Sequence, residues 1–246
     1  MSRAQGPENL IERPGLRDKV RVFDDRHQAG AEVAGAVREM GLDDPIVFAI
    51  PSGGIPIGVE VALALDIELR MMPVRKMTLP FNPEAGFGAV SLWGDQVLNR
   101  SLLGSLAMDQ EEIDRSREMA IERLERRIKG FDLDSGLDGL EARTAVLVDD
   151  GLASGFTMIA GVRAVKRGRP EDVAVAVPTG SGGAVARVSG VVDRLICLNV
   201  RTGPLFAVAD AYRRWHDLSD EEVDRVLRRY QDRGKGGGGL SAADLK

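Results

Sequence analysis

The sequence has very few of the residues that build disulfides and zinc sites. Among 246 residues there is one cysteine, Cys197, and there are two histidines, His27 and His216. A single cysteine excludes an intramolecular disulfide and is typical of a reducing compartment, so we predict a cytoplasmic protein. Cys197 lies in an apolar run and is expected to be a buried strand thiol. Neither histidine has a cysteine or histidine at ligand spacing, which argues against a histidine-based zinc site.

Long apolar runs and an excess of positive charge are also lacking. No stretch contains enough consecutive apolar residues to span a bilayer, and the polar N-terminus has no signal-peptide core. The formal net charge is -5, so the composition provides no basic surface for nucleic acid. We therefore expect no membrane partner, and nucleic-acid partners are disfavoured.

Strand-like and helix-like segments alternate along most of the chain. Apolar runs predict buried strands at residues 46–50, 67–74, 144–148, 172–177 and 194–200. Helical periodicity or turn spacing predicts helices at residues 26–40, 55–65, 156–167 and 182–189. Residues 20–24 are expected to form a short edge strand. This alternation indicates βαβ units, so the predicted fold is α/β, with a doubly wound, mainly parallel sheet of about five strands.

Three further segments complete the predicted organisation. Residues 77–84 contain two prolines and an asparagine and are expected to be a mobile connection, followed by a small hairpin of residues 89–92 and 96–98. Capping-box patterns at Asp109 and Ser219 predict a long charged helix and a final amphipathic helix. The charges of the long helix are interpreted as a solvated face with no role in chemistry. Residues 1–233 are expected to form a single domain, and residues 234–246 a flexible Gly-rich tail.

The most informative segment is residues 144–157. A buried strand delivers two adjacent carboxylates, Asp149 and Asp150, to its C-terminal end, and a loop with two glycines and two hydroxyl residues leads into a helix. Ligands of open α/β sheets bind at this edge, and the start of a helix suits a phosphate. The two acids suit a ribose diol or a hydrated Mg²⁺ between them and the phosphate. The alternative, in which Asp150 only caps the helix, needs one acid and not two.

This segment resembles the phosphoribosyl diphosphate (PRPP) motif of the type I phosphoribosyltransferases. That motif has four apolar residues, two acids and a loop ending in Thr/Ser-Gly-X-Thr. The resemblance implies that Asp149 and Asp150 hold the ribose hydroxyls, and a Mg²⁺ directly or through water. It implies that the following loop cradles the 5′-phosphate, and this loop comprises Gly151, Leu152, Ala153, Ser154, Gly155, Phe156 and Thr157. Phe156 departs from the small residue that is usual at its position.

A second segment resembles the loop with which the family binds pyrophosphate, often X-Arg-Gly-Gly after an earlier strand. Here that loop is Pro51-Ser52-Gly53-Gly54, which implies that Ser52, Gly53 and Gly54 contact pyrophosphate. By itself, Gly-Gly would equally satisfy an ordinary strand-to-helix turn. Ser52 stands where an arginine is common, so one cationic contact is missing.

Two basic residues at the end of the predicted third strand, Arg75 and Lys76, could supply the missing charge. In the family, a basic residue here often reaches pyrophosphate, which makes Lys76 a candidate catalytic residue together with the two acids. The alternative is that both are solvated residues at a strand end. Residues 77–98 would then correspond to the flexible loop that closes over the reaction centre.

The resemblance extends over most of residues 20–229. Residues 83–90, 97–99, 206–212 and 218–223 are similar to one subgroup of uncharacterised family members. A hood from about residues 1–25 and 201–230 is implied over the acceptor base, where Phe206, Tyr212 and Trp215 either face the base or pack the hood's own core. Ala153 stands where enzymes for hypoxanthine and guanine carry an aspartate, which argues against that branch.

The implied function is transfer of 5-phosphoribose from PRPP to a small nitrogenous base, with release of pyrophosphate and with Mg²⁺ as cofactor. A homodimer is compatible with this resemblance. One alternative is a regulatory protein of the same fold that binds PRPP or a nucleotide without turnover, which the departures at Ser52 and Phe156 keep open. Another alternative is an enzyme that uses a different sugar-phosphate donor.

Overall fold

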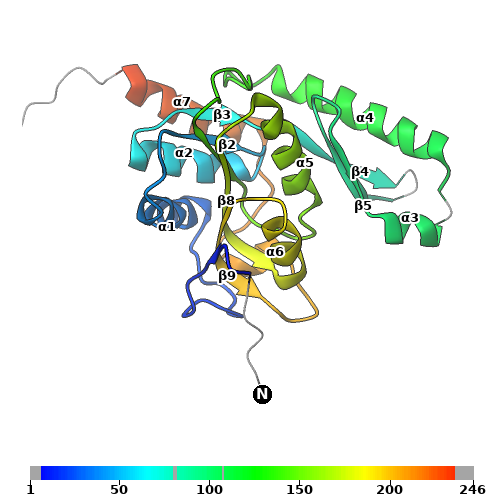
Figure 1. Ribbon diagram of the computed structural model, residues 1–246, viewed down its shortest axis with the longest axis horizontal. Coiled ribbons are helices and arrows are strands. Elements are labelled where there is room, and N and C mark those ends of the chain that lie inside the picture. Colours follow the sequence, from blue (N-terminus) through cyan, green and yellow to red (C-terminus); the bar gives the residue numbers. More distant parts are fainter. Residues whose placement is uncertain (1–6, 80–81, 107, 236–246) are drawn as a thin grey trace, which may run out of the picture.

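The computed structural model describes residues 7–79, 82–106 and 108–235. Its centre is a parallel sheet of six strands in the order β1-β9-β8-β7-β2-β3, with helices on both faces (Figure 1). The strands are β1 (Leu10–Ile11), β2 (Pro45–Ala49), β3 (Leu69–Met71), β7 (Thr144–Val148), β8 (Asp172–Ser181) and β9 (Arg194–Arg201). The predicted doubly wound α/β fold is therefore confirmed, with a sixth strand of two residues at one edge.

The helices divide into two layers, because each central strand is apolar on both sides. In β7, Ala145 and Leu147 join the core under α5 (Phe156–Val165) and α6 (Gly182–Ser189), whereas Val146 and Val148 join the core on the opposite face. That opposite face is covered by α1 (Arg26–Glu39), α2 (Gly54–Leu65) and α7 (Asp220–Lys235). Such strands, buried on both faces, appear in the sequence as continuous apolar runs.

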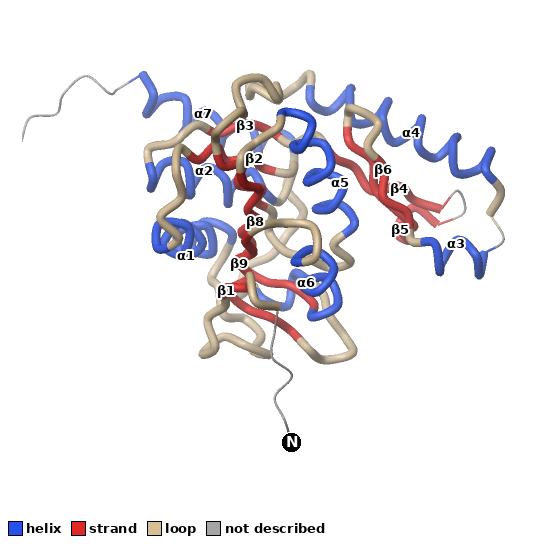
Figure 2. Tube along the Cα trace, viewed as in Figure 1, coloured by secondary structure: helices blue, strands red, loops and turns tan. Residues whose placement is uncertain are grey.

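A second, antiparallel sheet stands apart from the first (Figure 2). It consists of β4 (Val74–Leu79), β5 (Asn82–Ser91) and β6 (Gln96–Leu98), followed by α3 (Arg100–Leu106) and α4 (Gln110–Ile128). One face packs through Ala89 on the α5 side, and the other packs through Phe87 and Val90 against α3 and α4. We refer to β4, β5, β6, α3 and α4 as the second lobe.

The second lobe corrects two predictions. The strand expected at residues 67–74 is divided into β3 and β4, which belong to different sheets, because Pro73 has no N–H to continue the ladder of β3. Residues 77–79 are part of β4 and residues 82–84 part of β5, so the expected mobile connection is largely strand. Burial of Met77 and Leu79 in the lobe's core outweighs the local turn signals. The hairpin of residues 89–92 and 96–98 is present in β5 and β6.

Residues 20–24 do not form the expected edge strand; Phe23 makes an isolated bridge to Tyr212, and β1 takes the sheet edge beside β9. The other predicted elements are present, β8 extends four residues beyond its expected end, and α3 was not predicted. Both capping boxes are formed, at Asp109 with Glu112 and at Ser219 with Glu222. No helix in residues 7–79, 82–106 or 108–235 is long and apolar enough to cross a bilayer. Most of the predicted tail, residues 236–246, lies outside the described residues.

Candidate functional site

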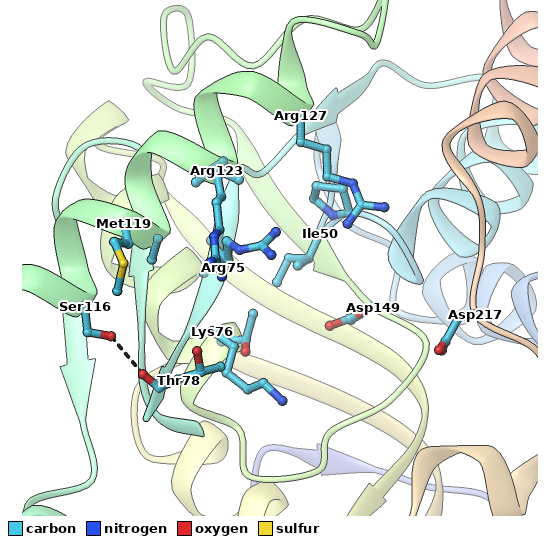
Figure 3. A pocket seen from close by; sticks show the side chains of 15 residues that line it. Ile50, Arg75, Lys76, Thr78, Ser116, Met119, Arg123, Arg127, Asp149 and Asp217 are labelled. Atoms are coloured by element: carbon cyan, nitrogen blue, oxygen red, sulfur yellow. Dashed lines mark hydrogen bonds between the residues drawn. The ribbon is translucent and has the colours of Figure 1, made fainter. Parts of the chain in front are cut away.

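A cavity of about 610 Å³ lies between the ends of β2 and β7 and the strand β4, with Ile50, Asp149 and Arg75 on its wall (Figure 3). Pairing of β2 with β7 sets Ala49 beside Val148, so the segments that follow both strands meet at this edge. The second lobe closes the opposite side. The cavity is lined from the main sheet by Pro51, Asp149 and Thr157, and from the second lobe by Arg75, Lys76, Arg123 and Arg127.

Asp149 and Asp150 lie half-buried at the end of β7. Oδ1 of Asp149 accepts a hydrogen bond from the backbone N–H of Asp150 at 2.8 Å. Burial, and then the neighbouring Asp150 carboxylate, raise the pKa of Asp149 well above its ordinary value. Burial also raises the pKa of Asp150, although the Arg26 guanidinium acts in the opposite direction. A ligand that brings hydroxyl donors or a cation to Asp149 would offset the cost of this buried charge.

Arg26, the first residue of α1, holds Asp150 in place and was not identified from the sequence. Its Nε donates to Oδ2 of Asp150 at 2.9 Å, and its Nη1 donates to the carbonyl oxygen of His216 at 3.0 Å. Its guanidinium carbon lies 3.8 Å from the centre of the Trp215 ring, a cation–π contact. The Tyr212 hydroxyl donates to the carbonyl oxygen of Asp150 at 2.6 Å. Asp150 is thus tied to both α1 and the segment before α7.

Two segments from opposite ends of the chain, residues 21–23 and 210–212, lie side by side. Backbone N–H groups of Arg21 and Phe23 donate to the carbonyl oxygens of Asp210 and Ala211. Tyr212 is 3% exposed and packs against Phe23, with ring centres 5.8 Å apart. Tyr212 therefore packs the core of this region, which is one of the two roles considered for its aromatic residues.

The loop of residues 51–54 packs directly against the carboxylates. A Cβ added to Gly53 would lie 2.0 Å from Oδ2 of Asp150, and one added to Gly54 would lie 2.6 Å from the carbonyl oxygen of Val148. Any side chain at either position would collide with the end of β7. The structure therefore brings the two predicted motifs into contact, with Pro51 on the cavity wall.

The loop of residues 151–157 leads from β7 into α5. Leu152 is 2% exposed, and its N–H and C=O are bonded to the backbone of β8, so it anchors the loop. Gly155 has φ +80°, a conformation that favours glycine, and precedes the first turn of α5. Within the part of the chain that the structure describes, the N–H groups of Ser154, Gly155 and Thr157 have no acceptor. Such a set of open N–H groups at a helix start is suited to an anion.

Other residues of this loop differ in their positions. Thr157 lines the cavity, whereas Ala153 and Ser154 are exposed. Phe156 is half-buried against the α5–α6 core, and the Arg187 guanidinium carbon lies 5.6 Å from its ring centre. The unusual bulk of Phe156 is therefore accommodated by packing at the start of α5.

The basic residues of the site lie on the second lobe. Arg75 and Lys76 are inside β4, which corrects the expectation that they end a strand of the main sheet. Arg123 and Arg127 of α4 also line the cavity, so part of the helix interpreted as a solvated face belongs to the site (Figure 3). Helical spacing of four residues places both on one face, but the sequence does not show what that face meets.

The side chains of this site supply only part of the ligand set that a Mg²⁺ needs. No cluster of three or more histidine, cysteine, aspartate or glutamate side chains suitable for a metal occurs among the described residues. Asp150 is engaged by Arg26, whereas Asp149 faces the cavity (Figure 3). Mg²⁺ is commonly held by one or two carboxylates together with substrate phosphates and water. The donor set thus fits a metal that arrives with a phosphorylated ligand and contacts Asp149.

Comparison with known proteins identifies relatives over most of the chain. A family model described as "Phosphoribosyl transferase domain" matches residues 95–208. Two curated relatives from strains of Mycobacterium tuberculosis, both named "Putative phosphoribosyl transferase", are 34% identical over 226 residues, which cover 92% of this chain and 51% of theirs. The chain thus spans about half the length of these relatives.

A solved structure, that of TT1426 from Thermus thermophilus, is also 34% identical. The alignment covers 85% of this chain and 98% of that chain, with a TM-score of 0.66. The region matched by the family model includes β7 and the loop of residues 149–157, which carry the PRPP motif. Sequence motif, fold and relatives agree, and the chain belongs to the phosphoribosyltransferase family.

Proposed function

We propose that this protein binds PRPP together with Mg²⁺ and transfers its 5-phosphoribose to a small nitrogenous base, releasing pyrophosphate. One observation supports this most: the ends of both predicted motifs, at Pro51, Asp149 and Thr157, line one cavity with four basic side chains. A carboxylate on one side and cations on the other match a ligand with sugar hydroxyls in its middle and phosphates at its ends. A lone buried cysteine is in keeping with a cytoplasmic location.

Each part of PRPP has a complementary group. The open N–H groups of Ser154, Gly155 and Thr157 and the Thr157 hydroxyl would bind the 5′-phosphate. Asp149 would accept hydrogen bonds from the ribose hydroxyls, while Asp150, bound by Arg26, keeps the end of β7 in position. Residues 51–54, Arg75 and Lys76 would surround the pyrophosphate.

The reaction needs little covalent chemistry from the protein. The bond between ribose C1 and pyrophosphate breaks, its electron pair leaves with pyrophosphate, and the lone pair of the base nitrogen forms the new bond. The N–H proton of the base is released to solvent. Positive charge on the ribose and negative charge on the leaving group grow together, so positioning and electrostatics dominate. When bound, Mg²⁺ supplies charge neutralisation at the diphosphate. Lys76 and Arg75 would stabilise the same negative charge.

A regulatory protein that binds PRPP or a nucleotide without turnover is the second candidate. It is favoured by Ser52, which leaves the residue 51–54 loop without the arginine that is common there. Turnover of PRPP separates the two, because both proteins would bind PRPP but only a transferase would release pyrophosphate when a base is added.

The deciding experiment measures pyrophosphate release from Mg²⁺ and PRPP with a panel of purine and pyrimidine bases. Asp149→Asn serves as the matched variant. It keeps the shape of the side chain and removes a charge whose burial is unfavourable, so we expect its melting temperature to be no lower than that of the intact protein. PRPP binding, measured by calorimetry, should nevertheless fall about ten-fold or more, because charge-assisted bonds to the hydroxyls are lost.

Two outcomes would contradict the proposal. If no base supports pyrophosphate release while PRPP binds, the regulatory alternative gains. If Asp149→Asn binds PRPP as well as the intact protein does, Asp149 does not hold the ribose.

A further inference from the structure

Four basic side chains of the second lobe line the cavity, and two of them, Arg123 and Arg127, belong to neither sequence motif. Arg123 and Arg127 are separated by one turn of α4 and face the cavity beside Arg75 of β4 (Figure 3). Arg75, Arg123 and Arg127 also line an adjoining cavity of about 470 Å³, together with Arg126 and Asp220. Three guanidinium groups from two elements therefore converge at the side of the site opposite Asp149.

Asp149 and Asp217 line the same cavity, but Arg127 is the one arginine of the three with an ion pair to a described residue. Among the residues whose side chains the structure describes, Arg75 and Arg123 have neither a hydrogen-bond acceptor nor an ion-pair partner. Arg127 is bonded to Oδ1 of Asp220, through Nη2 at 2.8 Å and Nε at 3.1 Å. Burial, and then repulsion from Arg127, Arg123 and Arg126, lower the pKa of Arg75. An anion of high charge is what would stabilise such a group of cations.

The residue 51–54 loop provides the second observation. Gly53 and Gly54 lie so close to Asp150 and Val148 that no side chain fits at either position. Ser52 cannot supply a permanent positive charge. A diphosphate carries several negative charges and needs donors that can bind two phosphoryl groups. Guanidinium groups bind such oxygens in pairs, with a planar fork that a lysine lacks.

From this geometry we propose that Arg123 and Arg127 of α4, together with Arg75, bind the diphosphate group of the donor and take the place of the arginine missing at position 52. This inference rests on the proposed function and extends it. It assigns discrimination between a diphosphate donor and a monophosphate to a helix of the second lobe. Asp220 acts as a positioning residue, because it holds the Arg127 fork at the edge of the cavity.

Calorimetry on the full chain tests the assignment with three ligands in the presence of Mg²⁺: PRPP, ribose 5-phosphate and inorganic pyrophosphate. The variants are Arg123→Gln and Arg127→Gln. Arg115→Gln is the matched control, because Arg115 lies on the same helix, is 64% exposed in its side chain and pairs with Glu111. Arg123→Lys keeps the charge and removes the fork.

We expect Arg123→Gln and Arg127→Gln each to weaken the binding of PRPP and pyrophosphate about ten-fold or more, because charge-assisted hydrogen bonds are lost. The affinity for ribose 5-phosphate should change less than about two-fold, because its phosphate would bind in the residue 151–157 loop. Arg115→Gln should behave as the intact protein for all three ligands. The affinity of Arg123→Lys for PRPP and pyrophosphate should lie between those of the intact protein and Arg123→Gln. Because this variant keeps the charge and folds, its loss of affinity would not come from unfolding.

The results separate this inference from the proposed function. If pyrophosphate binds through Arg123 and Arg127 but PRPP gives no turnover with any base, the anion site stands and the transferase function fails. If PRPP is turned over while Arg123→Gln and Arg127→Gln bind PRPP and pyrophosphate as tightly as Arg115→Gln does, the inference is wrong and the function stands. If the variants weaken ribose 5-phosphate binding as much as PRPP binding, the inference is also wrong. The arginines would then not distinguish the diphosphate of PRPP from its 5′-phosphate.

Discussion

The two acids at the end of β7 have different environments despite their adjacency. Asp150 is bound by Arg26 and its backbone carbonyl by Tyr212, whereas Asp149 is bonded to the backbone of Asp150 and faces the cavity. Gly53 lies so close to the Asp150 carboxylate that an added Cβ would be 2.0 Å from its Oδ2. At the scale of single residues, the site therefore depends on space as much as on charge, since nothing larger than glycine fits beside the held carboxylate.

Gly53→Ala tests this dependence. The new Cβ would lie 2.0 Å from Oδ2 of Asp150, so either the carboxylate leaves Arg26 or the loop shifts. Overpacking of this kind costs about 1–3 kcal/mol. We expect a lower melting temperature by scanning calorimetry and a loss of PRPP binding.

Gly35→Ala is the matched control on α1. An added Cβ there meets nothing within 4 Å, so the exchange should stabilise the helix by about 0.5–1 kcal/mol and leave PRPP binding unchanged. Unchanged binding in Gly53→Ala would show that close contact between the loop and Asp150 is dispensable.

At the scale of elements, the second lobe has a core of its own. Met77, Leu79, Phe87, Val90 and Leu103 form a buried cluster with residues of α4, separate from the two clusters of the main sheet. A unit with its own apolar core can open locally while the rest of the molecule stays folded. Because α4 carries Arg123 and Arg127, such opening would separate the basic side of the site from Asp149.

Phe87→Ala should loosen this unit selectively. Phe87 is 0% exposed, and removal of its ring costs about 3–5 kcal/mol of stability. Hydrogen exchange should become faster across residues 74–128 and change much less in β7 and β8. PRPP affinity should fall by more than ribose 5-phosphate affinity.

Phe23→Ala provides the comparison, because Phe23 is also 0% exposed but lies in the core beside Tyr212. In Phe23→Ala, hydrogen exchange should instead become faster around residues 20–24 and 210–214. A uniform increase over the whole chain in Phe87→Ala would mean that the second lobe does not open on its own.

At the scale of the whole molecule, one ion-pair network joins helices from distant parts of the chain. Oε1 of Glu60, on α2, accepts from Nη1 of Arg229 on α7 at 2.7 Å and lies 3.0 Å from Nδ1 of His27 on α1. Burial acts to raise the pKa of Glu60, but the hydrogen bonds from His27 and Arg229 and the Arg229 charge outweigh it, and the pKa is lowered. Residues 202 positions apart are thereby connected on one face.

A carboxyl group whose pKa is lower in the folded protein than in the unfolded chain stabilises the fold at pH values above its unfolded pKa. This stabilisation is lost as the pH falls through its lower folded pKa. Glu60→Gln should therefore reduce stability near neutral pH by about 0.2–1 kcal/mol, because the network is partly exposed. The difference from the intact protein should shrink when unfolding is followed from about pH 7 down to about pH 3.

Glu171→Gln makes the same chemical change at an exposed position whose side chain pairs with no described residue. It should leave the stability curve nearly unchanged. A constant difference between Glu60→Gln and the intact protein at all pH values would exclude an electrostatic role for the network.

The sequence by itself determined the alternating α/β architecture, the strand β7, the loops at residues 51–54 and 149–157 and both capping boxes. Each depends on a local pattern: apolar runs, glycines between a strand and a helix, or a cap with an acid three residues later. Two motifs about 100 residues apart were expected in one site because of the resemblance to the family, and the structure sets their strands, β2 and β7, side by side.

Only the tertiary structure decided which distant groups complete that site. Arg26 reaches Asp150 across 124 positions, and Arg123 and Arg127 turn toward the cavity from a helix whose charge pattern is typical of a solvated surface. The division of residues 67–79 between two sheets likewise depends on long-range pairing and on burial of Met77 and Leu79. Helical periodicity fixes which residues share a face, but the partner of that face depends on how the lobes pack, and local sequence does not encode that packing.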